Sequence, residues 1–250
     1  MGVWYTIFGC RCSYGEKARP AVFRTREKSQ ERGVVTMNED AGGIVLNEEQ
    51  KDMLKEFGNI GAGNAVTALS MLLNTKVTIN VPGVEIIPLA KLPLYFEDPY
   101  ELVAGAAMHA SGDAEGTFLL ILDSEATKKV LEILLGTPPA SLTELSEMEQ
   151  SALGEIGNIM CGSYLVALSN FTNLNLESTP PVVLLDMISG IVTEAALVTV
   201  GKEFEDNIIL VETEMSADVF SRSVRGMIFF IPGPGALERI LEAMGWKPDA

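Results

Sequence analysis

Two glutamate–asparagine pairs with the same spacing are the groups in this sequence best placed to do chemistry. Asn59 follows Glu56 by three residues, and Asn158 follows Glu155 in the same way. A carboxylate can pair with a cation, and a carboxamide both donates and accepts hydrogen bonds, so each pair could hold a polar partner. The chain has one histidine and three cysteines. They leave little material for a zinc site or a disulfide framework.

Both pairs belong to a longer internal repeat. Residues 52–82 and 151–181 align without gaps at an offset of 99, and eleven of the 31 positions are identical. Such a repeat predicts two copies of one structural unit. A single copy has too few strands to bury both faces of its sheet. We therefore expect one pseudo-symmetric α/β (α+β) domain over 37–250, in which the copies, about 46–136 and 145–246, share one sheet.

Local sequence signals divide each copy in the same order. Asn47 and Ser146 each have a Gln or Glu three residues on, which is the capping-box pattern of a helix start. Each copy is expected to run as a long helix, strands of antiparallel type and a shorter closing helix. The expected helices are 47–73, 124–135, 146–172 and 234–244, and the expected strands are 77–88, 102–110, 116–122, 181–185, 193–200, 207–215 and 224–231. The second copy is about ten residues longer, which we assign to connections near 201–206 or 216–223.

The two faces of each long helix differ in character. At 100° per residue the apolar residues form one narrow stripe. Four positions lie opposite that stripe: Asp52, Glu56, Asn59 and Gly63 in the first copy, and Ser151, Glu155, Asn158 and Gly162 in the second. Exposed Glu and Asn residues are ordinary in a single helix. Asn and Gly, however, are disfavoured inside helices by about 0.5–1 kcal/mol each relative to Ala, so their recurrence indicates a docking surface. A surface helix offers no pocket, which favours a macromolecule as the partner.

The glycines of the first helix could instead form a phosphate-binding loop. Gly58, Gly61 and Gly63 would then have to lie between a strand and a helix. They fall inside the helical pattern, and Met160 replaces Gly61 in the second copy. The pattern therefore favours a helix over a loop.

The charge balance excludes some partners. Acidic residues outnumber basic ones by 34 to 18, giving a net charge of −16. Nucleic-acid binders rely on clustered Lys and Arg, so DNA and RNA are not expected partners. No apolar run reaches about 18 residues, so no membrane insertion is expected and the chain is expected to be cytoplasmic. Residues 1–36 carry seven basic and three acidic residues. We interpret them as an N-terminal extension that is disordered or a start-site artefact, with Met37 as the true start.

With these residues in place, the sequence resembles the CheC/CheX/FliY family of chemotaxis phosphatases. The family motif is Asp or Ser, three residues, Glu, two residues, Asn, twenty-two residues and Pro. The sequence holds it twice with every spacing met, as Asp52, Glu56, Asn59 and Pro82, and as Ser151, Glu155, Asn158 and Pro181. The resemblance covers about residues 46–246.

The resemblance implies hydrolysis of the aspartyl phosphate on CheY, the chemotaxis response regulator, at two active sites. Asn59 and Asn158 would hold the attacking water, while Glu56 and Glu155 would pair with a lysine of the regulator. An acyl phosphate is already activated, so positioning a water in line supplies much of the rate gain. Mg²⁺ would belong to CheY, and the chain itself is expected to use no metal and no cofactor. The supporting motif positions are Asp52, Ser151, Gly63, Gly162, Pro82 and Pro181.

The resemblance also implies a second partner, the receptor deamidase CheD. The segment that resembles the family's CheD-docking segment is Leu185, Asp186, Met187, Ile188, Ser189 and Gly190. Asp186 would be its polar anchor. The first copy has no match around Ile87, so one CheD per chain is expected. An ordinary strand-to-helix turn explains 185–190 equally well.

Two other functions remain open on the sequence. The chain could be a non-catalytic adaptor that regulates CheD, or a structural component of the flagellar switch. The Glu and Asn of both copies favour the phosphatase, because neither an adaptor nor a switch component needs a water-positioning Asn.

Overall fold

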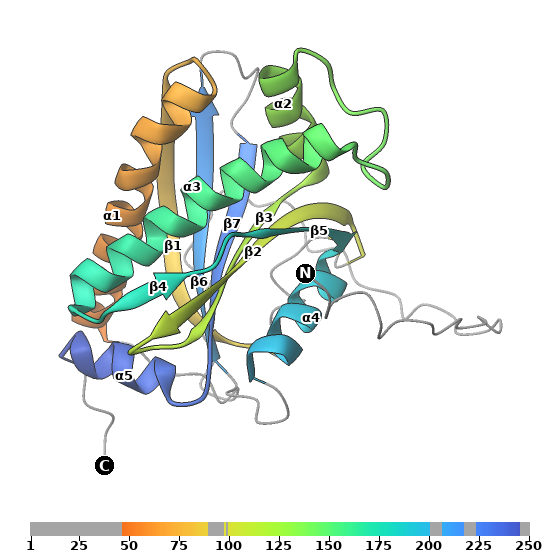
Figure 1. The fold of residues 1–250 in the computed structure, drawn as a ribbon. Helices are drawn as coiled ribbons and strands as arrows, with labels where there is room; N and C mark the ends of the chain where they lie inside the picture. Colours follow the sequence, from red (N-terminus) through yellow and green to blue (C-terminus); the bar gives the residue numbers. More distant parts are fainter. Residues whose placement is uncertain (1–46, 90–97, 99, 201–206, 218–223, 246–250) are drawn as a thin grey trace, which may run out of the picture. The chain divides into compact units, whose positions relative to one another are not determined.

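A computed structural model describes residues 47–89, 98, 100–200, 207–217 and 224–245 (Figure 1). The expected extension over 1–36 lies outside these residues. The helices are α1 (Glu48–Leu72), α2 (Ser124–Leu135), α3 (Glu147–Thr172), α4 (Ile188–Val200) and α5 (Ala236–Ala243). The strands are β1 (Val77–Pro88), β2 (Leu102–Gly112), β3 (Gly116–Leu122), β4 (Leu176–Ser178), β5 (Val182–Met187), β6 (Asn207–Ala217) and β7 (Val224–Pro232). None of the described helices is long and apolar enough to cross a membrane.

The described strands form one antiparallel sheet in which the two copies interleave. Its order is β1-β6-β7-β3-β2-β4, and β5 also pairs with β2. In the repeat, β1 corresponds to β4 and β5, β2 to β6, and β3 to β7. The equivalent strands β3 and β7 therefore pair at the centre. Each copy's first strand pairs with the second strand of the other copy, as β1 does with β6 and β5 with β2. This confirms one shared sheet to which both copies contribute strands.

The sheet separates two apolar clusters. Alternate residues of each strand face opposite sides. In β3, Phe118 and Leu120 belong to the larger cluster under α1 and α3, whereas Leu119 and Ile121 belong to a smaller cluster with α4. Figure 1 shows α1 and α3 beside each other, running in roughly opposite directions. The two long helices therefore cover the same face of the sheet.

The long helices meet at the pseudo-two-fold axis. The Nδ2 of Asn64 donates to the backbone oxygen of Ser163 at 3.5 Å, and these two residues are equivalent in the repeat. Close by, Gly61 faces Tyr164, and a Cβ built on Gly61 would lie 2.5 Å from Tyr164 Cδ1. The equivalent positions are Met160 and Ala65. Large and small residues are thus exchanged between the copies where the helices touch.

The structure corrects one expected element. The sequence predicts a strand over 193–200, and this is wrong, because these residues belong to α4. Their Val and Thr content favours a strand. The buried positions nevertheless follow a helical period, and they are Ile188, Ile191, Val192, Ala195 and Ala196. Packing of this stripe on the sheet overrides the local preference.

The other expected elements are present with small shifts. The three-residue strand β4 was not predicted from the sequence, and β2 and β6 each run two residues further than expected. The connection 188–206, which includes α4, is longer than 89–101, its counterpart in the first copy. The other proposed location of the second copy's added residues is 216–223. Its first two residues are the end of β6, and 218–223 lie outside the described residues, as do 201–206.

Candidate functional site

Capping boxes set the start of both long helices, as expected. Asn47 Oδ1 accepts from the backbone N–H of Gln50 at 2.9 Å, and the Gln50 side chain accepts from the backbone N–H of Asn47 at 2.7 Å. Ser146 and Glu149 exchange the same bonds at the start of α3. Hydrogen bonds from the Ser146 side chain and backbone hold the pKa of the Glu149 carboxyl below its usual value. The two helices thus begin at equivalent residues, which places their motif residues on equivalent faces.

Two glycines allow the motif segments of α1 and α3 to pack closely on the sheet. A Cβ on Gly58 would lie 2.6 Å from Val84 Cγ2, and a Cβ on Gly157 would overlap the Cβ of Ala106. These glycines immediately precede Asn59 and Asn158. They let the helix backbone approach the strands, so they fix the height of each Asn above the sheet. This packing role was not predicted from the sequence, although the identity of the two glycines in the repeat was the available signal.

In the second copy the motif residues line one open groove. The groove runs between α3 and the segment that joins β4 to β5, and its lining residues are Gln150, Ser151, Gly154, Glu155, Asn158, Ser178, Thr179, Pro180, Pro181 and Val183. Pro181 also packs near Gly157. The spacing of the motif therefore has a structural reason: its proline lies in the segment that joins β4 to β5 and lines the same groove as Asn158.

In the first copy the same residues lie on the outer face of α1. Asp52, Glu56, Asn59 and Gly63 are all exposed, and Pro82 is exposed on β1. The four pair residues of the two copies are Glu56, Asn59, Glu155 and Asn158, and none of their side chains makes a hydrogen bond or an ion pair with another described residue. Their polar groups are therefore available to a partner.

The glycines on the outer face have no internal packing role. A Cβ on Gly63 or Gly162 would meet no atom within 4 Å. This sets them apart from Gly58 and from Gly61, whose added Cβ atoms would meet side chains. The three glycines considered for a phosphate-binding loop, Gly58, Gly61 and Gly63, all lie within α1, so that interpretation is wrong. A glycine in open space inside a helix weakens the helix, and the absence of a side chain favours close approach by another molecule.

The groove chemistry suits recognition and orientation more than covalent catalysis. No histidine or cysteine lines the groove, so the Ser151 hydroxyl has no imidazole base there. Within the described residues no group of three or more His, Cys, Asp or Glu side chains could hold a metal ion. What remains is a carboxylate and a carboxamide one helical turn apart, which can hold a cation and a water.

The segment 185–190 forms the junction of β5 and α4. Asp186 Oδ1 accepts from the backbone N–H of Met187 at 2.7 Å, and the same carboxylate lies over Gly190. Asp186 and Met187 are exposed, whereas Ile188 is buried in the smaller cluster. Leu185 and Ser189 are half-buried. The segment is thus a strand-to-helix turn that presents one carboxylate and one methionine to solvent.

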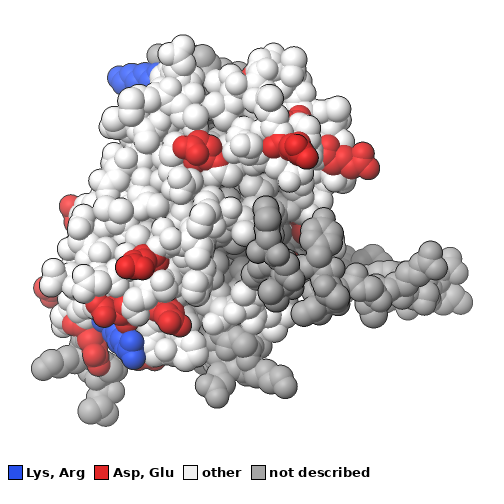
Figure 2. Space-filling model, viewed as in Figure 1, with Lys and Arg blue, Asp and Glu red and all other residues white. Residues whose placement is uncertain are grey.

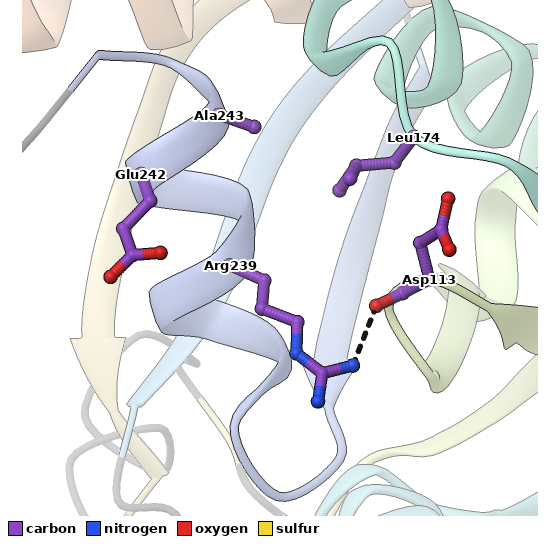
Figure 3. Close-up of a pocket in the computed structure, with 5 residues that line it drawn as sticks. All are labelled: Asp113, Leu174, Arg239, Glu242 and Ala243. Carbon is purple, nitrogen blue, oxygen red and sulfur yellow. Dashed lines mark hydrogen bonds between the residues drawn. The ribbon is translucent and has the colours of Figure 1, made fainter.

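A second hollow lies at the other end of the sheet and contains no motif residue. It is lined by Asp113, Leu174, Arg239, Glu242 and Ala243 (Figure 3). The Arg239 guanidinium donates to the backbone oxygen of Asp113 at 2.9 Å. This bond joins α5 to the β2–β3 turn, so Arg239 has a structural role in the hollow.

Comparison with known proteins identifies the family. The model of the CheC-like family matches residues 49–86 and 148–185, which are the long helix and following strand of each copy. The CheY-P phosphatase CheC of Bacillus subtilis is 31% identical over 202 residues, which cover 80% of this chain and 96% of that protein. The chain belongs to the CheC-like family. The resemblance predicted from the two motifs is confirmed.

Other relatives place the fold among flagellar and chemotaxis proteins. The flagellar motor switch phosphatase FliY of B. subtilis is 34% identical over 143 residues, covering 57% of this chain but 37% of FliY. The structure of Thermotoga maritima FliY matches with a TM-score of 0.62 at 24% identity, over 81% of this chain and 98% of that one. The FliM middle domain of Helicobacter pylori matches with a TM-score of 0.57 at 16% identity, over 80% and 100%. At these identities the two structures support the fold alone.

Proposed function

We propose that this protein hydrolyses the aspartyl phosphate of phosphorylated CheY, with one active site in each copy. The observation that carries the proposal is the recurrence of a Glu–Asn pair without internal contacts on the exposed face of both long helices. The B. subtilis relative named a CheY-P phosphatase resembles the chain over nearly its whole length, which supports the same activity.

In the proposed reaction Asn59 or Asn158 orients the attacking water. The side-chain oxygen accepts a hydrogen bond from that water and the amide N–H group can donate to a phosphoryl oxygen, so the Asn needs to take no proton itself. The water oxygen forms a bond to phosphorus while the bond from phosphorus to the aspartyl oxygen breaks. The aspartate leaves as a carboxylate, and the protons of the water pass to the phosphate product and to solvent. Mg²⁺ is assigned to the CheY partner.

Glu56 and Glu155 are assigned to docking. Each lies one helical turn before its Asn, so both side chains lie on the same face of the helix. An ion pair with a lysine of CheY would fix the register of the helix over the phosphorylated aspartate. Such positioning is worth much in phosphoryl transfer, because a misplacement of about 1 Å can cost about a hundredfold in rate.

Single-site variants test this assignment. The rate of CheY-P dephosphorylation is measured with wild-type protein, Asn59→Ala, Asn158→Ala and the control Asn170→Ala, which removes an exposed Asn at the far end of α3. Each site variant is expected to keep only the activity of the intact copy, while the control keeps full activity. Equal activity in all four proteins would contradict the assignment. No acceleration by the wild-type protein would favour an adaptor or a flagellar-switch role.

A second proposed function is CheD binding at 185–190. The exposed Asp186 carboxylate and the 42% exposed Met187 side chain support it, because they lie together at the end of β5. Asp186→Asn keeps an acceptor for the N–H of Met187 but removes the charge. This variant is expected to weaken CheD binding in a titration while leaving CheY-P hydrolysis unchanged. Unchanged CheD affinity in Asp186→Asn and in Met187→Ala would contradict the proposal.

A further inference from the structure

The two copies differ in charge on the helix flank beside the asparagine. In the second copy, Gln150 and Gly154 line the groove next to Asn158. At the offset of 99, the corresponding residues of the first copy are Lys51 and Lys55. Lys55 lies four residues before Asn59, so the two are neighbours on the surface of α1. The first copy therefore has two lysines at positions where the second copy has uncharged residues.

Only one of these two lysines has its charge already paired. Lys51 Nζ lies 2.7 Å from a carboxylate oxygen of Glu48, so its charge is largely offset. Lys55 is exposed and makes no ion pair with any residue in the described part of the chain. Figure 2 shows more acidic than basic side chains on one face of the protein, most of which carries neither. Lys55 is therefore a cation beside Asn59 that pairs with no side chain in the described part of the chain.

From these observations we infer that Lys55 is a recognition residue of the first site, which pairs with an anionic group of the docked partner, and that the second site has no counterpart. The inference rests on the proposed CheY-P phosphatase function. The anionic group is either the phosphoryl group or a carboxylate next to it. A charge at the edge of an interface acts mainly on encounter and on salt dependence, because salt screens exposed pairs. Lys55 therefore adds a salt-dependent contribution to docking at the first site, beyond the pairing assigned to Glu56 and Glu155, and the second site lacks this contribution.

The test compares the two sites one at a time. Asn158→Ala leaves only the first site and Asn59→Ala leaves only the second. Each background receives Lys55→Gln, with Lys128→Gln, an exposed lysine of α2, as the matched control. CheY-P hydrolysis is measured at low and high salt. In the first-site background Lys55→Gln is expected to raise KM about two- to fivefold at low salt, the range of an exposed ion pair, and to have no effect at high salt. In the second-site background it is expected to change nothing.

A lysine introduced at the equivalent position of the second copy tests the inference in the opposite direction. A Cβ on Gly154 would lie 3.7 Å from Val183 Cγ2, an ordinary contact, so Gly154→Lys fits the helix. In the Asn59→Ala background it is expected to increase the salt dependence of the KM of the second site.

The outcomes separate the possible failures. A rise in KM alone indicates pairing with a carboxylate of CheY, and a fall in kcat indicates the phosphoryl group; both support the inference. Equal effects of Lys55→Gln in the two backgrounds, no effect in either, or an inactive first-site background would overturn it. A wild-type protein that does not hasten dephosphorylation would instead contradict the proposed function.

Discussion

The ring of Tyr164 on α3 fills the space above Gly61 on α1. Phe57, one turn before Gly61, meets the same ring edge to face, with the ring centroids 6.0 Å apart. Tyr164 is fully buried. Because Gly61 lies between Asn59 and Gly63, this contact sets the position of the first site from a residue that belongs to the second copy.

A side chain at position 61 is therefore expected to destabilise the protein. Gly61→Ala places its Cβ within 2.5 Å of the Tyr164 ring. Overpacking of a core costs about 1–3 kcal/mol. Urea unfolding of the wild type and of Gly61→Ala measures this cost. The control is the double variant Gly61→Met/Tyr164→Ala, which places a large residue on α1 and a small one on α3, as the equivalent pair Met160 and Ala65 does in reverse. It is expected to recover part of the lost stability. No recovery would contradict the exchange of large and small residues between the copies.

The buried phenol of Tyr164 gives a second prediction. Its hydroxyl has no hydrogen-bond partner among the described residues, and burial raises its pKa. Tyr164→Phe removes an unsatisfied group and is expected to leave stability unchanged or raise it by about 1 kcal/mol near neutral pH. Because the folded-state pKa is raised, the wild type loses stability as the pH rises above the unfolded-state value of about 10, and the Phe variant does not. Parallel loss in both proteins at alkaline pH would refute this role.

Substitutions of the outer glycines, Gly63 and Gly162, are expected to change activity and stability in opposite directions. Gly63→Ala and Gly162→Ala add a Cβ in open space, so each is expected to stabilise its helix by roughly 0.5–1 kcal/mol. Both are expected to lower CheY-P hydrolysis, since the partner must then approach past a methyl group. Gly58→Ala is the contrasting variant, expected to lose stability as well as activity. Full activity in Gly63→Ala and Gly162→Ala together would show that nothing approaches that face closely.

The α3 capping box predicts a pH-dependent contribution to stability. The Ser146 hydrogen bonds lower the pKa of Glu149 below 4.5. A lowered carboxyl pKa contributes stability that is present above the unfolded-state value and is lost as pH falls through the folded-state value. The difference in unfolding free energy between the wild type and Glu149→Ala is therefore expected to be larger at pH 7 than at pH 3. A difference that stays constant or grows on acidification would contradict the bond pattern.

The long helices and their outer faces could be predicted because their evidence is local. The capping residues Asn47 and Ser146, the apolar stripe and the repeated Glu–Asn spacing each depend on residues within a few turns. The repeat also predicted the shared sheet. It could not supply the strand exchange, in which β1 pairs with β6, because pairing between distant strands leaves no local signal.

Other features depended on packing partners far away in the sequence. The glycine at position 61 is explained by the Tyr164 ring that packs against it. The glycine at position 157 is explained by its close contact with Ala106. The α4 segment was misassigned because its Val and Thr residues suit a strand locally, whereas the sheet buries Ile191, Val192 and Ala195 as a helical stripe.

The double variant Asn59→Ala/Asn158→Ala tests the central claim most directly. CheY-P dephosphorylation and the affinity for CheY-P are measured on the same preparation, because Glu56 and Glu155 remain to dock the partner. Hydrolysis is expected to fall to the intrinsic rate of CheY-P alone while binding persists. Hydrolysis at the wild-type rate in the double variant would contradict the assignment of the two asparagines.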